Sequence, residues 1–215
     1  APMSWGSWLL MIVYPALWVN TLIRIPEPFQ GKVPLFDRWS AELNRHPVLI
    51  KNIGIANMLL GTLLGMYTGV LLSSFGARPL WNSAMLWMLF LVSGLSAAAA
   101  FVHLFTTDEY ERELLAKSDN AFLTLELFVF GGFLSGLLTS SRVHIEAARL
   151  LLDGPYAPVF WVFVIGMGIL LPLTIQLLAV NHKVRHTAVA PILVLAGGLA
   201  LRFVIVYAGQ YSHWT

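Results

Sequence analysis

Six long apolar stretches constrain this chain more than any other feature of its sequence. Each has about 18–23 residues, the length that an α-helix needs to cross a hydrocarbon core of about 30 Å. They cover residues 5–22, 53–75, 83–105, 121–138, 159–178 and 188–208. Hydrophobic residues make up 58% of the 215 and charged residues 11%, whereas a soluble domain carries about 25% charge. Because lipid forces backbone groups to pair within each span, the sequence predicts an all-α, polytopic membrane bundle forming a single transmembrane domain over residues 1–215.

The basic residues predict how the spans are oriented. Nine of the 13 Lys and Arg residues lie in the predicted loops 23–52, 106–120 and 179–187, three lie in loops on the opposite side, and Arg202 lies within a span. The positive-inside rule places the nine-charge side in the cytoplasm. We therefore expect both ends of this segment to be extracytoplasmic. The small net charge of +2 gives no reason to expect a nucleic-acid partner, and the spans imply contact with membrane lipid.

Two loops are long enough to hold helices at the membrane surface. In the first, Asp37–Arg45, Asp37 is placed to act as an N-cap and Pro47 follows the end of the segment. The second, Val143–Leu152, mixes apolar and charged residues and ends at Asp153. Each helix is either a connector on the membrane surface or a docking surface for a peripheral subunit.

Tyr67, Glu126 and Arg202 lie inside the predicted spans, where a polar group is costly unless it is paired or faces a cavity. From the rise per residue, Tyr67 and Arg202 lie about 12 Å and 9 Å below the outer edges of their spans. Glu126 lies about 8 Å from the opposite, cytoplasmic edge. Tyr67 is either a packed core tyrosine or a phenol that hydrogen-bonds a ligand carbonyl near the outer surface.

The other polar groups also have a structural and a functional interpretation. Arg202 stays charged, so it either extends outward to the membrane surface or pairs inside the bundle. Glu126 is either a structural hydrogen-bonding group or a carboxyl group that takes up and releases protons. These two lie at different depths, so a direct ion pair between them is not expected, and a chain of water molecules is one way to connect them. His103 lies near the cytoplasmic edge of its span. Asp119, in the run Ser118-Asp119-Asn120, is interpreted as an N-cap of the following span, with a catalytic role as the alternative.

The sequence argues against several kinds of redox centre in this chain. There is no Cys, which excludes thiolate ligation of an iron–sulfur cluster. Ligation of haem by two histidines needs one in each of two facing spans, but His103 is the only one of the six histidines inside a predicted span. No set of ligands has the composition of a metal site, so we expect neither haem nor metal here.

Several short segments, spread over nearly the whole chain, form a specific combination. They are Pro2-Met3-Ser4-Trp5-Gly6-Ser7-Trp8, Tyr67-Thr68-Gly69 followed by Ala77–Asn82, Phe90–Ser96, Asp119 with Leu125-Glu126-Leu127, Phe160-Trp161 with Gly168 and Pro172, and Gly197–Arg202 running on to Gln210. In this order they resemble the NrfD/polysulfide-reductase membrane-subunit family, whose members are quinone-reactive and free of haem.

The resemblance implies a multi-pass subunit of the bacterial inner (cytoplasmic) membrane. Members of the family work with an extracytoplasmic iron–sulfur subunit and often with a molybdopterin catalytic subunit. The tyrosine matching Tyr67 is the family's contact with the quinone, which is menaquinone or ubiquinone. We expect Trp81 and Asn82, in the turn that follows, to line the same quinone site.

The resemblance also bears on proton movement and on length. Glu126 and Arg202 match positions associated with proton movement in parts of the family, and we extend the expected proton pathway to His103 and Asp119. Family members usually have eight or more spans. The first two spans, with a polar pair that helps to hold the quinone, are therefore expected to be missing from this sequence or supplied by another polypeptide.

Taken together, these features predict the membrane anchor and quinone- or quinol-reactive subunit of a respiratory oxidoreductase complex, which exchanges electrons with an extracytoplasmic iron–sulfur subunit. The protein by itself is expected to carry out no cofactor-based catalysis. Two alternatives remain open. One is a proton- or ion-translocating membrane subunit, and the other is a purely structural membrane anchor.

Overall fold

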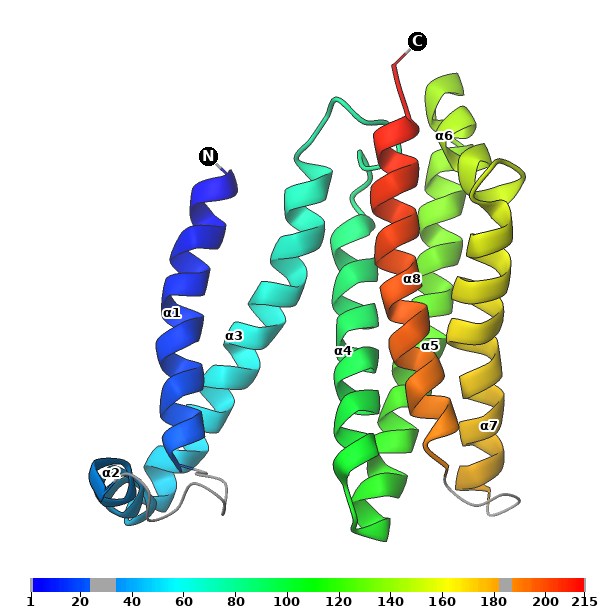
Figure 1. Ribbon diagram of the computed structural model, residues 1–215. Helices are drawn as coiled ribbons and strands as arrows, with labels where there is room; N and C mark the ends of the chain where they lie inside the picture. Colours follow the sequence, from blue (N-terminus) through cyan, green and yellow to red (C-terminus); the bar gives the residue numbers. More distant parts are fainter. Residues whose placement is uncertain (1, 24–33, 182–186, 215) are drawn as a thin grey trace. The chain divides into compact units, whose positions relative to one another are not determined.

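The computed structural model describes residues 2–23, 34–181 and 187–214, so parts of the predicted loops 23–52 and 179–187 lie outside the described residues. The described residues form helices and no strand, as the sequence predicts (Figure 1). Within them, six helices are long and apolar enough to cross a membrane: Trp5–Ile23, Pro47–Ser73, Leu86–Phe105, Glu109–Leu138, Val159–Val180 and Val189–Tyr211. The protein is a helical membrane bundle, and the six predicted spans are confirmed in number and order.

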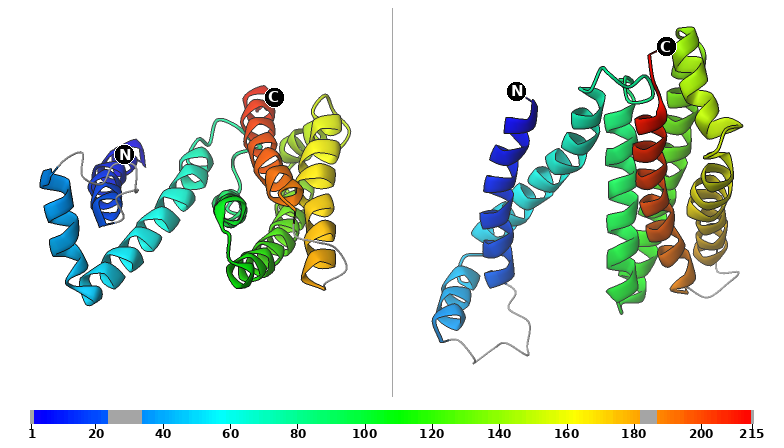
Figure 2. Two further views of the ribbon diagram at one scale, coloured as in Figure 1. Left: turned by 60° about the horizontal axis from the view of Figure 1, so that its bottom comes forward. Right: turned by 45° about the horizontal axis from the view of Figure 1, so that its top comes forward.

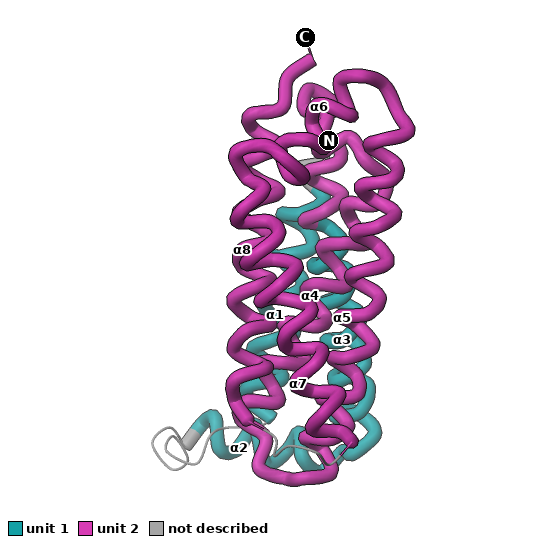
Figure 3. The backbone as a smooth tube through the Cα atoms, turned by 90° about the vertical axis from the view of Figure 1, so that its right-hand side faces the viewer, with its two compact units in different colours: residues 1–67 teal, residues 68–215 magenta. Residues whose placement is uncertain are grey.

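The chain divides into two compact units, residues 1–67 (unit 1) and residues 68–215 (unit 2), which Figure 3 shows in teal and magenta. The boundary falls inside the helix α3 (Pro47–Ser73), which begins in unit 1 and ends in unit 2. The prediction that all 215 residues form one transmembrane domain therefore stays a prediction.

Unit 1 contains α1 (Pro2–Ile23), α2 (Pro34–Asn44) and the larger part of α3. The short helix α2 covers the end of α1. Asn44 Nδ2 and Ser40 Oγ donate hydrogen bonds to the Ile23 carbonyl oxygen at 3.1 and 3.5 Å. Because the last carbonyls of a helix have no helical donor, these side chains satisfy a group that would otherwise lack a partner. Further along α1, the Ala16 carbonyl oxygen accepts a hydrogen bond from Asn57 Nδ2 of α3 at 3.4 Å.

Both surface helices that the sequence predicts are present. α6 (Arg142–Leu152) matches the predicted segment within one residue. α2 begins at Pro34, earlier than predicted, because proline is favoured at the first helical position. Asp37 therefore lies in the first turn of α2 and is not its N-cap, although a carboxylate in this turn still interacts favourably with the helix dipole.

Unit 2 contains α4 (Leu86–Phe105), α5 (Glu109–Leu138), α6, η2 (Val159–Leu170), α7 (Leu171–Val180) and α8 (Val189–Tyr211). Four membrane-length segments lie side by side, with η2 and α7 forming one of them, and α6 lies at the end that carries the C terminus (Figures 1 and 2). The core between them is built from large apolar side chains that are fully buried, among them Phe130, Phe133, Phe160, Leu201 and Ile205. This packing forms a closed interior in which polar side chains must find partners within the protein.

α5 begins at Glu109, well before the apolar stretch that starts at residue 121. Asp108 caps the helix, and its side chain accepts a hydrogen bond from the Tyr110 backbone N–H at 3.3 Å. The first turns carry charges such as Lys117, so apolarity alone does not mark where the helix starts. The prediction that Asp119 is an N-cap is wrong, because Asp119 lies about three turns inside the helix.

The segment η2 is a π-helix that changes to α-helix at Leu171. The Leu171 N–H donates to the carbonyl oxygen of Gly166, five residues earlier, and Pro172 then has no N–H to continue the pattern. At this level Gly168 of η2 contacts Gly197 of α8 backbone to backbone, because a Cβ on either residue would overlap the backbone of the other. Glycine on both helices is what permits this close crossing.

Candidate functional site

Tyr67 lies in α3 and belongs to unit 1. Its phenol ring packs against Gly6 of α1, because a Cβ at Gly6 would fall on the ring and its hydroxyl group. Gly6 is buried and Tyr67 is half-buried. The missing side chain at Gly6 thus makes room for the ring, and Gly6 positions the phenol, a role that the sequence alone did not assign to it.

Trp81 and Asn82 lie in the connection between α3 and α4 and belong to unit 2. Trp81 is buried, and its indole N–H donates a hydrogen bond to the Ile205 carbonyl oxygen of α8 at 2.9 Å. Its ring packs on Gly209, where a Cβ would overlap the indole. Asn82 is exposed, and its backbone N–H donates to the Arg78 carbonyl oxygen at 3.1 Å. The indole of Trp81 is therefore engaged with α8, and a quinone contact at Trp81 or Asn82 stays a prediction.

The same connection is tied to the C-terminal residues that follow α8. Arg78 Nη1 donates to the Ser212 carbonyl oxygen at 2.9 Å and lies 2.8 Å from Nδ1 of His213. Trp214 Nε1 donates to the Gly76 carbonyl oxygen at 2.8 Å. These contacts hold the loop and the tail together as one surface at this end of unit 2.

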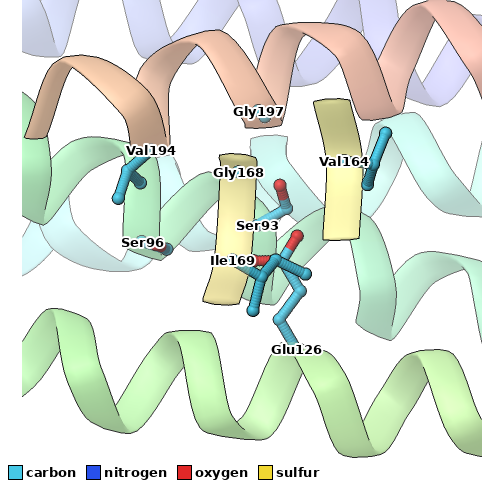
Figure 4. Close-up of a pocket in the computed structure, with 9 residues that line it drawn as sticks. Ser93, Ser96, Glu126, Val164, Gly168, Ile169, Val194 and Gly197 are labelled. Atoms are coloured by element: carbon cyan, nitrogen blue, oxygen red, sulfur yellow. The ribbon is translucent and has the colours of Figure 1, made fainter. Parts of the chain in front are cut away.

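Glu126 of α5 lies in the interior of unit 2 and is only 4% exposed. The side-chain hydroxyl of Ser93 in α4 lies near its carboxyl group. Together with Ser96, these residues border a narrow gap whose other walls come from η2 and α8, including Gly168 and Gly197 (Figure 4). The gap has no room for a water molecule in this structure, so the side chains themselves form the polar contacts.

Arg202 of α8 lies near Glu126 without forming an ion pair with it. Its Nη1 donates to the Gly198 carbonyl oxygen at 2.7 Å, and its guanidinium carbon lies 5.9 Å from the centre of the Phe90 ring, within the range of a cation–π interaction. The charges of Arg202 and Glu126 attract each other, but no nitrogen–oxygen distance between them is 4.0 Å or less. The expectation that these two residues do not pair directly is confirmed.

Asp119, two turns from Glu126 along α5, lies in a second polar group in the interior of unit 2. Its side chain is fully buried. Ser96 Oγ of α4 donates to Oδ1 of Asp119 at 2.5 Å, and Gln176 Nε2 of α7 donates to Oδ2 at 2.7 Å. Asp119 thus joins three helices, a role quite different from that of a helix cap.

Two polar groups follow one another through the interior of unit 2. The first contains Arg202, Glu126 and Ser93, and the second contains Ser96, Asp119 and Gln176. Asp119 and Glu126 are seven residues apart on α5, which puts them on one face about 10 Å apart. Ser93, Ser96 and Gln176 were not predicted as site residues. The sequence does contain a sign of them, because two serines three residues apart and one glutamine stand within largely apolar helices.

His103 lies on α4 beyond Ser96, toward the end of unit 2 opposite the C terminus. It is buried and borders a cavity of about 50 Å³ together with Arg112 and Pro191. Among the described residues, no group of three or more His, Cys, Asp or Glu side chains is placed to hold a metal ion. The assignment of His103 to a proton pathway is not tested by these contacts.

The chain matches the family described as "Polysulphide reductase, NrfD" over residues 1–212. It belongs to the NrfD family. This membership confirms the resemblance that the sequence segments indicated. No solved structure matches the chain.

Three curated relatives are similar to this NrfD-family protein. The protein NrfD homolog of Haemophilus influenzae is 33% identical over 175 residues, which cover 76% of this chain and 54% of that protein. The C subunit of the polysulfide reductase of Wolinella succinogenes is 32% identical over 174 residues, which cover 75% of this chain and 55% of that subunit. Protein NrfD of Escherichia coli is 31% identical over 168 residues, which cover 72% of this chain and 52% of that protein. The chain spans about half the length of the curated relatives that it matches.

Proposed function

We propose that this NrfD-family protein is the membrane anchor and quinone- or quinol-reactive subunit of a respiratory oxidoreductase complex. The family match over residues 1–212 carries the proposal. The relative from Wolinella succinogenes is named as one subunit of a polysulfide reductase. By analogy, the present protein works with other subunits and supplies the part that lies in the membrane.

The proposed electron partner is an extracytoplasmic iron–sulfur subunit, which in turn serves a molybdopterin catalytic subunit. We place its docking surface at the end of unit 2 formed by α6, residues 76–82 and residues 212–214. The contacts of Arg78 and Trp214 make this end a fixed surface, as a docking face requires. The positive-inside rule assigns this end to the outside of the bacterial inner membrane.

The proposed quinone contact is Tyr67. A phenol O–H can donate a hydrogen bond to a quinone carbonyl oxygen, and the half-buried ring is already held in place by Gly6. In unit 2, the contact of Trp81 with α8 fixes the connection that carries Asn82. The quinone, menaquinone or ubiquinone, supplies the redox chemistry, while the protein supplies binding, orientation and access for protons.

The proposed proton route uses the polar interior of unit 2. Ser93 lies beside Glu126, on which the charge of Arg202 also acts, and Ser96 donates a hydrogen bond to Asp119. His103 is buried further along α4. A carboxyl group such as that of Glu126 can accept and release a proton, and a neighbouring hydroxyl such as that of Ser93 can pass it on. This arrangement supports proton transfer through the interior of unit 2.

The test of the quinone contact is Tyr67→Phe in the assembled complex. The substitution removes one hydrogen bond to the substrate, so we expect quinol turnover to fall by about tenfold while the complex still assembles. Steady-state kinetics with a soluble quinol would measure the change. Tyr110→Phe, at an exposed tyrosine outside the interior, is the matched control and should leave turnover unchanged. Equal rates for the wild type and Tyr67→Phe would rule out the contact.

A second function, a proton- or ion-translocating subunit, is favoured by the succession of buried polar groups in unit 2. The protein reconstituted alone in lipid vesicles should then move protons down an imposed gradient, as reported by an internal pH-sensitive dye. Silent vesicles, with quinol turnover intact in the complex, would support the electron-transfer proposal. A complex that assembles but binds no quinone-site inhibitor would instead support a purely structural anchor.

A further inference from the structure

The two buried carboxyl groups of unit 2 differ in how their charge is balanced. The charge of Arg202 acts on Glu126, but Asp119 receives hydrogen bonds only from the neutral groups of Ser96 and Gln176. No basic nitrogen of the described residues lies within 4.0 Å of the Asp119 carboxyl group. A buried carboxylate without a cation is very costly, so either a proton or a cation that the described residues do not supply must neutralise Asp119.

Two buried amide oxygens, one on a hydrogen-bond partner of Asp119 and one on the next residue of α5, also lack a partner among the described residues. Oε1 of Gln176, a residue that is 2% exposed, has no hydrogen-bond donor, and neither has Oδ1 of the neighbouring Asn120, which is 8% exposed. The NH₂ group of Gln176 is hydrogen-bonded to Asp119, and bond lengths place Oε1 about 2.3 Å from that nitrogen. The unpaired oxygen therefore lies next to the carboxyl group. Buried acceptors without donors are rare and indicate a missing ligand.

The side chains around Asp119 indicate which kind of ligand would fit. Ser96 Oγ donates to Oδ1 of Asp119 at 2.5 Å, and the amide of Gln176 lies beside Oδ2. The donor set is thus one carboxylate with neutral amide and hydroxyl oxygens, which suits hard cations that prefer oxygen ligands. A monovalent cation would leave this site neutral, whereas a divalent cation would leave a net charge in the apolar interior.

We propose that Asp119, Gln176 and Asn120, with Ser96 beside them, form a binding site for a monovalent alkali cation such as Na⁺. The ion would neutralise Asp119 and occupy the two free amide oxygens, and would hold α4, α5 and α7 together. The inference rests on the contacts of unit 2 and requires no quinone. It goes beyond the proposed function, in which Asp119 belongs to a proton route.

The test is the sodium dependence of thermal unfolding of the detergent-solubilised protein. NaCl would be titrated against choline chloride at constant ionic strength, and the midpoint Tm would be followed by intrinsic Trp fluorescence. A ligand at about 100 times its Kd should raise Tm by about 5–10 °C for a protein of this size, and the rise should saturate. Asp119→Asn, which keeps the side-chain shape, should abolish the response, whereas Glu111→Gln, at an exposed carboxyl group of the same helix, should retain it.

Direct binding of ²²Na⁺ to the wild-type protein provides a second measurement if Asp119→Asn does not fold. One saturable ion per protein molecule supports the site, and no saturable binding overturns it. A Tm that is the same in NaCl and choline chloride would mean that a proton neutralises Asp119, and would also overturn it. Neither readout involves quinol, so the two proposals are tested separately. If no cation binds but Tyr67→Phe still lowers quinol turnover, the cation site is rejected and the proposed function stands.

Discussion

Single residues in the interior of unit 2 perform different tasks although they look alike in the sequence. Glu126 has a serine hydroxyl and the charge of Arg202 in its surroundings, and it borders a gap between four helices. Asp119 is held by donors from two other helices. Glu126 is therefore the better placed of the two to exchange protons, while Asp119 has a stronger structural role.

The role of Glu126 predicts the effect of Glu126→Gln. Glutamine keeps the size and hydrogen-bonding ability of the side chain but cannot release a proton, so quinol turnover should fall by about 10- to 100-fold. Turnover of the assembled complex with saturating quinol checks this, with Glu111→Gln as the control on the same helix. Normal turnover in Glu126→Gln would remove Glu126 from the proton route.

Trp81 gives a prediction about stability. In Trp81→Phe the hydrogen bond to the Ile205 carbonyl oxygen is lost and a small cavity forms against Gly209. We expect the free energy of unfolding to fall by about 1–2 kcal/mol and Tm to fall by several degrees, as measured by thermal unfolding in detergent. As a control, Trp18→Phe, at a tryptophan that is largely exposed, should lower Tm by less than Trp81→Phe does. If both substitutions lowered Tm equally, the contact of Trp81 with α8 would be unimportant for stability.

At the scale of the helices, the crossing of η2 and α8 leaves no room for a side chain at its glycines. Gly197→Ala places a methyl group on the backbone of Gly168, which cannot move without shifting the whole helix. We expect the free energy of unfolding to fall by about 3 kcal/mol or more, which would be seen as a lower Tm or as reduced assembly of the complex. Gly131→Ala in α5, where nothing lies within 4 Å of the new Cβ, should leave Tm unchanged or slightly higher. A harmless Gly197→Ala would contradict the close crossing.

The sequence predicts the helices better than it predicts their ends. α6 agrees within one residue because its apolar and charged residues are mixed over a short segment that Asp153-Gly154-Pro155 ends. α5 extends beyond its apolar stretch because its first turns carry charges, which helices tolerate well outside lipid. The π winding of η2 was not predicted, because its run of apolar residues looks the same in the sequence as that of an α-helical span.

For the molecule as a whole, the predicted orientation can be tested by labelling, because the protein has no cysteine of its own. Ser140→Cys and Thr107→Cys place single thiols at exposed positions at opposite ends of unit 2. A membrane-impermeant maleimide should label intact cells at residue 140 and reach residue 107 only after lysis. The reverse pattern would invert the topology and move the proposed docking surface to the cytoplasm.

The sequence by itself determined that this protein is a helical membrane bundle with six apolar spans, and it pointed to the family and to Tyr67, Glu126, Arg202 and Asp119. Those conclusions follow from chain-wide apolarity, from the cost of polar groups in lipid and from a specific order of short segments. Only the tertiary structure decided which partners these residues have. Hydrogen bonds such as that between Gln176 and Asp119 join residues far apart in the sequence, so no local pattern determines them.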